Sequence, residues 1–173
     1  MVDVTARPAA VWDGLPQAPQ WTEASLAAIA AHGAGLTETV PVDIESWCPG
    51  YGRAGAEERA AFWTGFISAL AEYESTFQPA VRGGRGRWIG LLQIAPATAR
   101  GYGCAAGSVS ELSDGAANLA CGVRIMAATV ARDGAIATRH GRWQGVAADW
   151  GPLRNARIRS EMSAWTRSQA YCR

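Results

Sequence analysis

Residues 57–74 carry the strongest helix pattern of this sequence, and the last of them is a glutamate. Glu57 and Glu58 stand in the first turn, where the helix dipole favours acidic groups. The apolar residues recur every three or four positions, which is the spacing of one helix face: Phe62, Phe66, Ala69, Leu70 and Tyr73. The pattern predicts a helix that packs this face against the core and ends at Glu74.

Helical patterns dominate the rest of the chain, and few segments alternate like strands. We expect further helices over residues 23–31, 96–100, 114–132, 142–150 and 155–171. Proline and glycine punctuate residues 36–55, which predicts a loop there. Residues 82–87 read RGGRGR, which predicts a basic glycine loop without regular structure. The fold class predicted is mostly α, with a minor β or loop element.

A length of 173 residues suits one compact domain. Residues 1–20 contain three prolines and no helix pattern, so we expect an extended N-terminal arm there and one domain over residues 21–173. The sequence contains no run of about 18 apolar residues, the length that a membrane-spanning helix needs, so we expect no membrane span. Residues 1–20 also lack the apolar centre of a signal peptide, which leaves the export route open.

The charged residues of the sequence exclude some classes of function. The formal net charge is +1, which argues against a polybasic nucleic-acid binder. All sixteen basic residues are Arg, so lysine chemistry is excluded. Residues 1–74 carry a net charge of −7 and residues 75–173 one of +8. This split indicates either a basic face for an anionic partner or pairing between the two halves.

Four cysteines at wide spacing favour two disulfides. Three pairings are possible, and we favour Cys104–Cys121 with Cys48–Cys172. Four free thiols in a cytosolic protein are the alternative. Two distant histidines and no CxxC pair make a zinc site a poor prediction, and we expect no metal and no cofactor. If the disulfides form, the working compartment is oxidising.

Glu74 stands out on physical grounds alone. It lies at the edge of the apolar helix face and in the last turn, where the helix dipole disfavours a carboxylate. Partial burial and the negative helix end both raise the pKa of a carboxyl group. Such a glutamate can hold a proton near neutral pH and deliver it as a general acid. The alternative interpretation is a solvated glutamate at a fraying helix end.

An ordered set of short motifs resembles the soluble lytic transglycosylase family of the lysozyme superfamily. The set spans roughly residues 57–154 and consists of Glu74-Ser75, Gly90-Leu91-Leu92-Gln93-Ile94, Pro96-x-Thr98-Ala99, and Asn118-Leu119 with Gly122. The resemblance implies a mostly helical lysozyme-like fold with a long cleft. It also implies peptidoglycan glycan strands as the substrate, and hence a periplasmic or secreted protein.

The resemblance assigns roles residue by residue. Glu74 resembles the single catalytic acid, which cleaves the β-1,4 bond between N-acetylmuramic acid and N-acetylglucosamine and closes a 1,6-anhydro ring. Gln93 resembles a cleft glutamine that contacts an acetamido sugar, or else a structural amide that ties its loop. Ser75 follows the acid and is expected in the substrate site. Asn118 matches a position that we interpret as scaffold.

Two departures from the family pattern bear on the chemistry. Ala147-Ala148-Asp149-Trp150 stands where the family has small residues and a Tyr-Asn pair. Trp150 could supply the cleft aromatic, and Asp149 could hydrogen-bond the sugar or serve as a second carboxylate. In the family, a loop Ser and a Gly-Ala step often precede the glutamine motif. Here no Ser occurs between Ser75 and Ser108, and the loop contains Arg85, Arg87 and Trp88 instead. The four cysteines are not general to the family either.

Three functions therefore stay open. A transglycosylase needs only Glu74, whereas a hydrolysing muramidase needs a water held opposite it, for instance by Asp149. The third is a non-catalytic peptidoglycan-binding module. We expect the protein to be a monomer with no nucleic-acid partner. We also expect Arg82, Arg85 and Arg87 to line the cleft and meet wall carboxylates, or else to pair with the acidic half.

Overall fold

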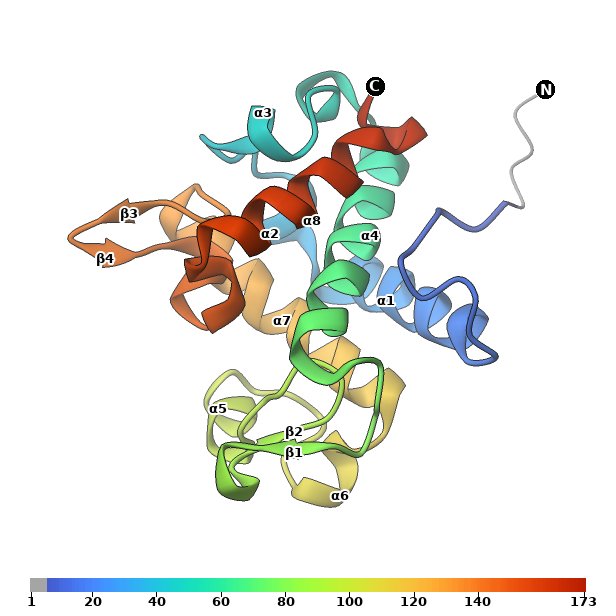
Figure 1. Ribbon diagram of the computed structural model, residues 1–173, viewed down its shortest axis with the longest axis vertical. Helices are drawn as coiled ribbons and strands as arrows, with labels where there is room; N and C mark the ends of the chain where they lie inside the picture. Colours follow the sequence, from blue (N-terminus) through green and yellow to red (C-terminus); the bar gives the residue numbers. More distant parts are fainter. Residues whose placement is uncertain (1–5) are drawn as a thin grey trace.

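Helix α4 (Ala56–Ser75) runs through the centre of the computed structural model, which describes residues 6–173 (Figure 1). Residues 62–71 are all buried, so the helix is covered on every side and not along one stripe. Small residues allow this close cover: a Cβ on Gly65 would overlap the hydroxyl of Tyr171. The predicted helix is therefore present, but its surroundings are those of a central helix.

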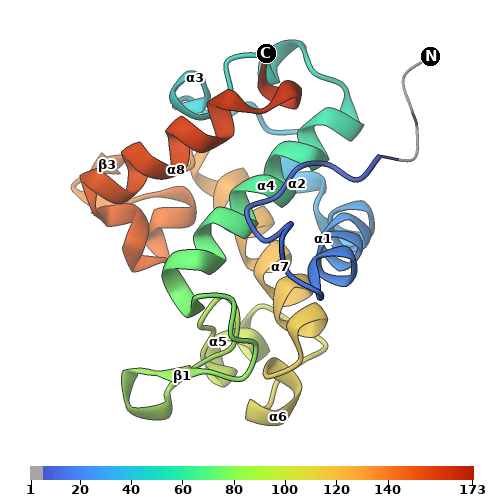
Figure 2. The ribbon, with the colours of Figure 1, turned by 45° about the vertical axis from the view of Figure 1, so that its right-hand side comes forward.

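The structure has three further long helices, and two of them pack against α4. Helices α1 (Ala18–His32) and α7 (Gly115–Asp133) pack against each other, and α1 also contacts α4. Helix α8 (Ala156–Ser168) crosses α4 on another side, and short α2 (Ala34–Thr37) fills the space between α4 and α7 (Figures 1 and 2). None of the helices in residues 6–173 has the length and apolar character of a membrane span.

A second group of elements lies beyond the C-terminal end of α4 (Figure 2). It contains the antiparallel strands β1 (Arg82–Gly83) and β2 (Trp88–Ile89), helix α5 (Pro96–Gly101) and helix α6 (Val109–Leu112). In the register of the hairpin, Gly83 lies opposite Trp88. The prediction of an irregular loop over residues 82–87 was wrong at its start, because Arg82 and Gly83 pair with β2 and the 3-10 turn Gly84–Gly86 lies between the two strands.

The predicted helix over residues 142–150 does not form. The segment begins with strand β4 (Arg142–Trp143), which pairs with β3 (Arg139–His140), and continues as a 3-10 helix, Gly145–Ala148. Gly145 explains the break, because its φ is +65° and a Cβ there would overlap the carbonyl oxygen of Ala135. Only glycine adopts this backbone without strain.

Two other predicted boundaries differ from the structure. The expected loop over residues 36–55 contains helix α3 (Ile44–Trp47) and a 3-10 turn, Tyr51–Arg53. Helix α1 begins at Ala18, five residues before the predicted start, because a proline in the first helical turn costs no hydrogen bond. Thr22 therefore lies inside the helix, where its hydroxyl accepts a hydrogen bond from Trp12 Nε1 at 2.9 Å.

The described part of the predicted N-terminal arm packs into the domain. Trp12 is completely buried and meets Trp21 edge to face, with ring centroids 5.7 Å apart. The backbone N–H of Val11 donates to Ser68 Oγ on α4 at 2.8 Å. Residues 1–5 of the predicted arm lie outside the described residues. From Ala6 onward, this segment covers one side of the central helix (Figure 2).

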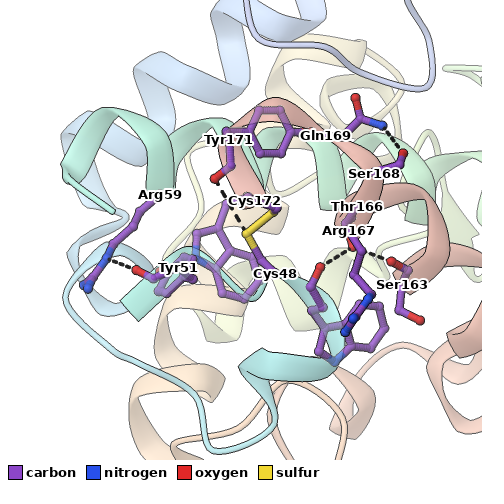
Figure 3. The surroundings of a disulfide bond; sticks show 12 residues. Cys48, Tyr51, Arg59, Ser163, Thr166, Arg167, Ser168, Gln169, Tyr171 and Cys172 are labelled. Atoms are coloured by element: carbon purple, nitrogen blue, oxygen red, sulfur yellow. Dashed lines mark hydrogen bonds between the residues drawn. A yellow bond between two sulfur atoms is a disulfide. The ribbon is translucent and has the colours of Figure 1, made fainter. Parts of the chain in front are cut away.

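The structure forms both disulfides of the favoured pairing. Cys48, which follows α3, joins Cys172 in the final 3-10 turn, and Thr166 Oγ1 donates to the carbonyl of Trp47 beside it at 2.7 Å (Figure 3). Cys104 joins the loop after α5 to Cys121 on α7. The first bridge closes 124 residues and the second closes 17.

The two bridges should differ in what they add to stability. In the chain-entropy account, C48S/C172S should lower the free energy of unfolding by about 5 kcal/mol and C104S/C121S by about 3 kcal/mol, since the longer loop loses more entropy in the unfolded chain. Urea titrations of the two double variants and the wild type measure this difference. An equal or larger loss for C104S/C121S would contradict the expectation.

Candidate active site

Glu74 lies in the last turn of α4, directly before a sharp reversal of the chain. The helix ends at Ser75, and the N–H of Thr76 donates to the carbonyl of Glu72 at 3.0 Å. Thr76 and Phe77 then adopt φ values of +51° and +60°, in the left-handed region that side chains other than glycine rarely occupy. Residues with such strained backbone angles cluster at functional sites, and these two follow Glu74 after one intervening residue, Ser75.

The carboxyl group of Glu74 lies in a half-buried position. No residue in the described range forms a hydrogen bond or an ion pair with it. Burial raises the pKa of this carboxyl from its ordinary value of 4.5 to about 7, because desolvation disfavours the charged form. Glu74 therefore exchanges a proton near neutral pH, as a general acid and base must.

Asn118 fixes the loop that faces this end of α4. Its buried Nδ2 donates to the carbonyls of Ile89 and Leu112, both at 2.9 Å, and its Oδ1 accepts from the N–H of Leu92 at 2.9 Å. Two of these hydrogen bonds hold the loop over residues 89–94 against α7, and the third holds the end of α6. These contacts agree with the scaffold role expected for Asn118.

Two glycines of the motif permit this close approach. Gly90 has a φ of +77°, and a Cβ there would overlap the Nδ2 of Asn118 and the carbonyl of Leu112. A Cβ on Gly122 of α7 would overlap the side chain of Leu92. The Gly90 and Gly122 positions of the motif are therefore explained by packing and not by direct contact with a ligand.

Gln93 ends the same loop in a left-handed conformation, with a φ of +50°. Its Nε2 donates to the carbonyls of Val81 and Gly90 at 3.1 and 3.0 Å, so both N–H groups bind the backbone. Within residues 6–173 its Oε1 accepts no hydrogen bond. Gln93 is thus a structural amide that also presents one oriented acceptor.

A pocket of about 70 Å³ lies beside Gln93. Trp150 is buried in its wall, and the indole Nε1 donates to the carbonyl of Leu92 at 2.8 Å. The structure thus brings three of the predicted site residues together, namely Gln93, Asp149 and Trp150, and it places Glu74 outside the lining of this pocket. The lining consists of Trp88, Gln93, Ile94, Ala95, Thr98, Ile125, Asp149 and Trp150.

Asp149 is exposed at the rim of the pocket. Partial desolvation raises the pKa of its carboxyl, and the guanidinium groups of Arg132 and Arg154 oppose that shift. The charges that act on Asp149 thus come from two arginines and from Asp133. Burial is the largest cause of the raised pKa for both Asp149 and Glu74, but charged neighbours also act on Asp149 and none acts on Glu74 within the described residues.

The other two predicted contacts do not line this pocket. Ser75 is buried, and its hydroxyl donates to the carbonyl of Ala71 within the helix at 3.0 Å. Arg87 is exposed on the β1–β2 hairpin, where its Nε donates to the carbonyl of Gly84 at 3.2 Å. The substrate-binding roles of Ser75 and Arg87 stay predictions.

Trp88 is the pocket residue that sequence reasoning did not select. It is the most exposed of the eight tryptophans, at 46% of its surface, and it lines the pocket from β2. A Cβ on Gly84 would overlap the indole, so the glycines of the hairpin make room for the ring. The signal in the sequence was a tryptophan inside an Arg-Gly run, away from any apolar stripe.

Comparison with known proteins gives two matches of different kinds. Residues 54–148 match the family described as "Transglycosylase SLT domain". Solved structures of DslA align over 98% of this chain and 100% of their own length: the wild-type form 2 is 28% identical with a TM-score of 0.89. Two DslA variants, each with one glutamate changed to glutamine, give TM-scores of 0.89 and 0.87 at 28% and 27% identity. No curated protein matches.

The raised pKa of Glu74 makes a prediction about stability. A carboxyl whose pKa rises on folding stabilises the native state below pH 4.5 and costs stability as pH rises through about 7. Glu74→Gln should therefore raise the free energy of unfolding at pH 8 by about 2–3 kcal/mol relative to wild type, with little difference at pH 4.

Urea titrations at both pH values measure this difference. Glu72→Gln is the matched control, since Glu72 is exposed on the same helix. A difference between Glu74→Gln and wild type that does not change with pH would contradict the assigned pKa.

Proposed function

Because the chain belongs to the transglycosylase SLT family, we propose that Glu74 is the single acid and base with which it cleaves peptidoglycan. The protein is a peptidoglycan lytic transglycosylase, and its mostly helical lysozyme-like fold is the one that the sequence predicted. The proposal concerns which residue carries out the reaction and which product leaves.

The reaction needs one group that first donates a proton and then accepts another. Protonated Glu74 gives its proton to the glycosidic oxygen, which joins C1 of N-acetylmuramic acid to C4 of N-acetylglucosamine, and the C1–O bond breaks with its electron pair on that oxygen. The carboxylate then takes the proton of the muramyl 6-hydroxyl while O6 bonds to C1. The product is a 1,6-anhydro ring, Glu74 is protonated again, and no water is consumed.

The observation that carries this proposal is the environment of the Glu74 carboxyl. With a pKa of about 7 it is both protonated and ionised in comparable amounts at neutral pH, so it can act first as acid and then as base. It has no hydrogen-bond partner within residues 6–173, so both oxygens remain available to the substrate. The substrate's own N-acetyl group can stabilise the positive centre at C1.

The surroundings of Asp149 favour this one-carboxylate mechanism over hydrolysis. A hydrolysing muramidase would need Asp149 to hold a water molecule opposite Glu74. Asp149 is exposed, belongs to a pocket that Glu74 does not line, and has arginines as its charged neighbours. Hydrolysis and mere peptidoglycan binding are therefore the two outcomes against which the proposal is tested.

We further propose that a sugar of the glycan strand occupies the pocket between Trp88 and Trp150. Gln93 Oε1 would accept a hydrogen bond from an amide or hydroxyl of that sugar, because its amide nitrogen is already held by the backbone. The two disulfides and a cell-wall substrate suggest a site of action outside the cytoplasm, in the periplasm or after secretion.

Product analysis on purified sacculi tests the mechanism. The wild type should release anhydromuropeptides, and Glu74→Gln should lower the rate of release by at least about 10³-fold, since the reaction then lacks its proton donor and acceptor. Glu72→Gln serves as the control and should release products at close to the wild-type rate. Reducing-end products would identify a hydrolase, and no release by the wild type would identify a binding module.

The pH dependence of kcat/KM provides a second test. Free enzyme must hold the Glu74 proton for the first step, so kcat/KM should fall above pH 7 with an apparent pKa of about 7. The same limb should remain in Asp149→Asn, because Asp149 is not the group that titrates. A limb that disappears in Asp149→Asn would transfer the acid role to that residue.

A further inference from the structure

We propose that Arg82, Arg85 and Arg87 form a rim that binds the carboxylates of peptidoglycan stem peptides. We call residues 82–89, which comprise β1, the turn and β2, the arginine hairpin. The inference rests on the proposed function, because it names the part of the same substrate that lies outside the sugar pocket. It makes the arginine hairpin a specificity determinant for strands that carry peptides.

The three arginines are not neutralised by the acidic half of the chain. All three side chains are exposed. The ion pairs formed within residues 6–173 use Arg7, Arg132, Arg142 and Arg157, and none uses an arginine of the hairpin. The intramolecular pairing that the charge split left open is thus not made by this cluster. Its three positive charges remain for an external anion.

At the tip of the arginine hairpin, Arg85 has a strained backbone conformation. Arg85 has a φ of +60° between Gly84 at +56° and Gly86 at +86°. Glycine adopts the left-handed region freely, whereas an arginine there is strained. A third glycine would make the same turn with less strain, so the chain's geometry alone does not account for the arginine.

Turn hydrogen bonds fix the arginine hairpin relative to Glu74. The N–H of Gln78 donates to the carbonyl of Ser75 at 3.1 Å, and the N–H of Val81 donates to the carbonyl of Gln78 at 3.3 Å. The carbonyl of Val81 then accepts from the N–H of Gly90 at 2.8 Å and from Gln93 Nε2 at 3.1 Å. The hairpin is therefore tied both to the end of α4 and to the Gln93 loop.

Trp88 joins the arginines to the sugar pocket. The guanidinium of Arg87 lies over the indole ring, 5.5 Å from its centroid, and the same ring lines the pocket with Gln93. A sugar against Trp88 would therefore have a positive charge at its edge. On a glycan strand, the group that extends outward from a muramyl ring is its lactyl-linked peptide, which ends in carboxylates. Guanidinium groups pair with carboxylates through two parallel hydrogen bonds.

Matched glycan strands test the inference by activity. The ratio of kcat/KM on peptide-bearing strands to kcat/KM on strands stripped of peptides by an amidase isolates the peptide contribution. R82Q/R85Q/R87Q should lower this ratio by about tenfold, the effect of three partly solvated charge pairs. The control R53Q/R167Q/R173Q removes the same charge around the other end of α4, where Cys48 bonds Cys172 and Arg167 donates to the carbonyl of Glu45, and should keep the wild-type ratio.

Binding tests the same inference without cleavage. In a Glu74→Gln background, sacculi whose carboxylates have been chemically amidated should bind about tenfold more weakly than native sacculi, and R82Q/R85Q/R87Q should abolish that difference. Equal binding to native and amidated sacculi would overturn the inference, as would an unchanged activity ratio for R82Q/R85Q/R87Q. If the wild type cleaves neither kind of strand, the proposed function fails while the binding result still decides the role of the arginines.

Discussion

The burial of α4 is the constraint on which the rest of this structure depends. A helix that is buried through residues 62–71 has to be covered on every side, and several parts of the chain do this, among them the N-terminal segment, α1, α2, α8 and the final 3-10 turn. This close packing is possible because Gly65 and Ser68 are small. The hydroxyl of Ser68 donates to the carbonyl of Gly65 and accepts a hydrogen bond from the N–H of Val11. Such a helix has little freedom to shift, so its last turn is a rigid support for a side chain.

The burial of α4 also explains the raised pKa of Glu74. The last turn of a buried helix is itself partly desolvated, and a carboxylate there lacks the water and the donors that would hold its pKa low. Glu74 is ionisable near neutral pH for this reason. The Gln93 loop needs equal rigidity, and the buried amide of Asn118 holds it with two hydrogen bonds, one to the carbonyl of Ile89 and one from the N–H of Leu92. Apolar packing therefore fixes α4, and the polar amide of Asn118 fixes the Gln93 loop in the same core.

The sequence predicted this arrangement where the signal was periodic or local. The helix that ends at Glu74, the glutamate's raised pKa and the helix of Asn118 all followed from spacing and elementary electrostatics, and the structure forms the favoured disulfides. The hairpin around Arg85 could not be predicted, because its strands are two residues long and leave no alternation to detect. The predicted helix at 142–150 failed because the glycine that breaks it, Gly145, is required by a contact with Ala135 that only the tertiary fold reveals. Trp88 was missed for the same reason: exposure is a property of the fold.

The central claim is that burial alone brings the Glu74 carboxyl into the neutral range. A ¹³C NMR titration of glutamate-labelled protein measures this directly, with the Glu74→Gln variant used to assign the Glu74 carboxyl resonance. The account predicts a midpoint of about 7 for that resonance. A midpoint near the ordinary value of 4.5 would contradict it, because Glu74 would then be a carboxylate throughout the neutral range and could not begin the reaction as an acid.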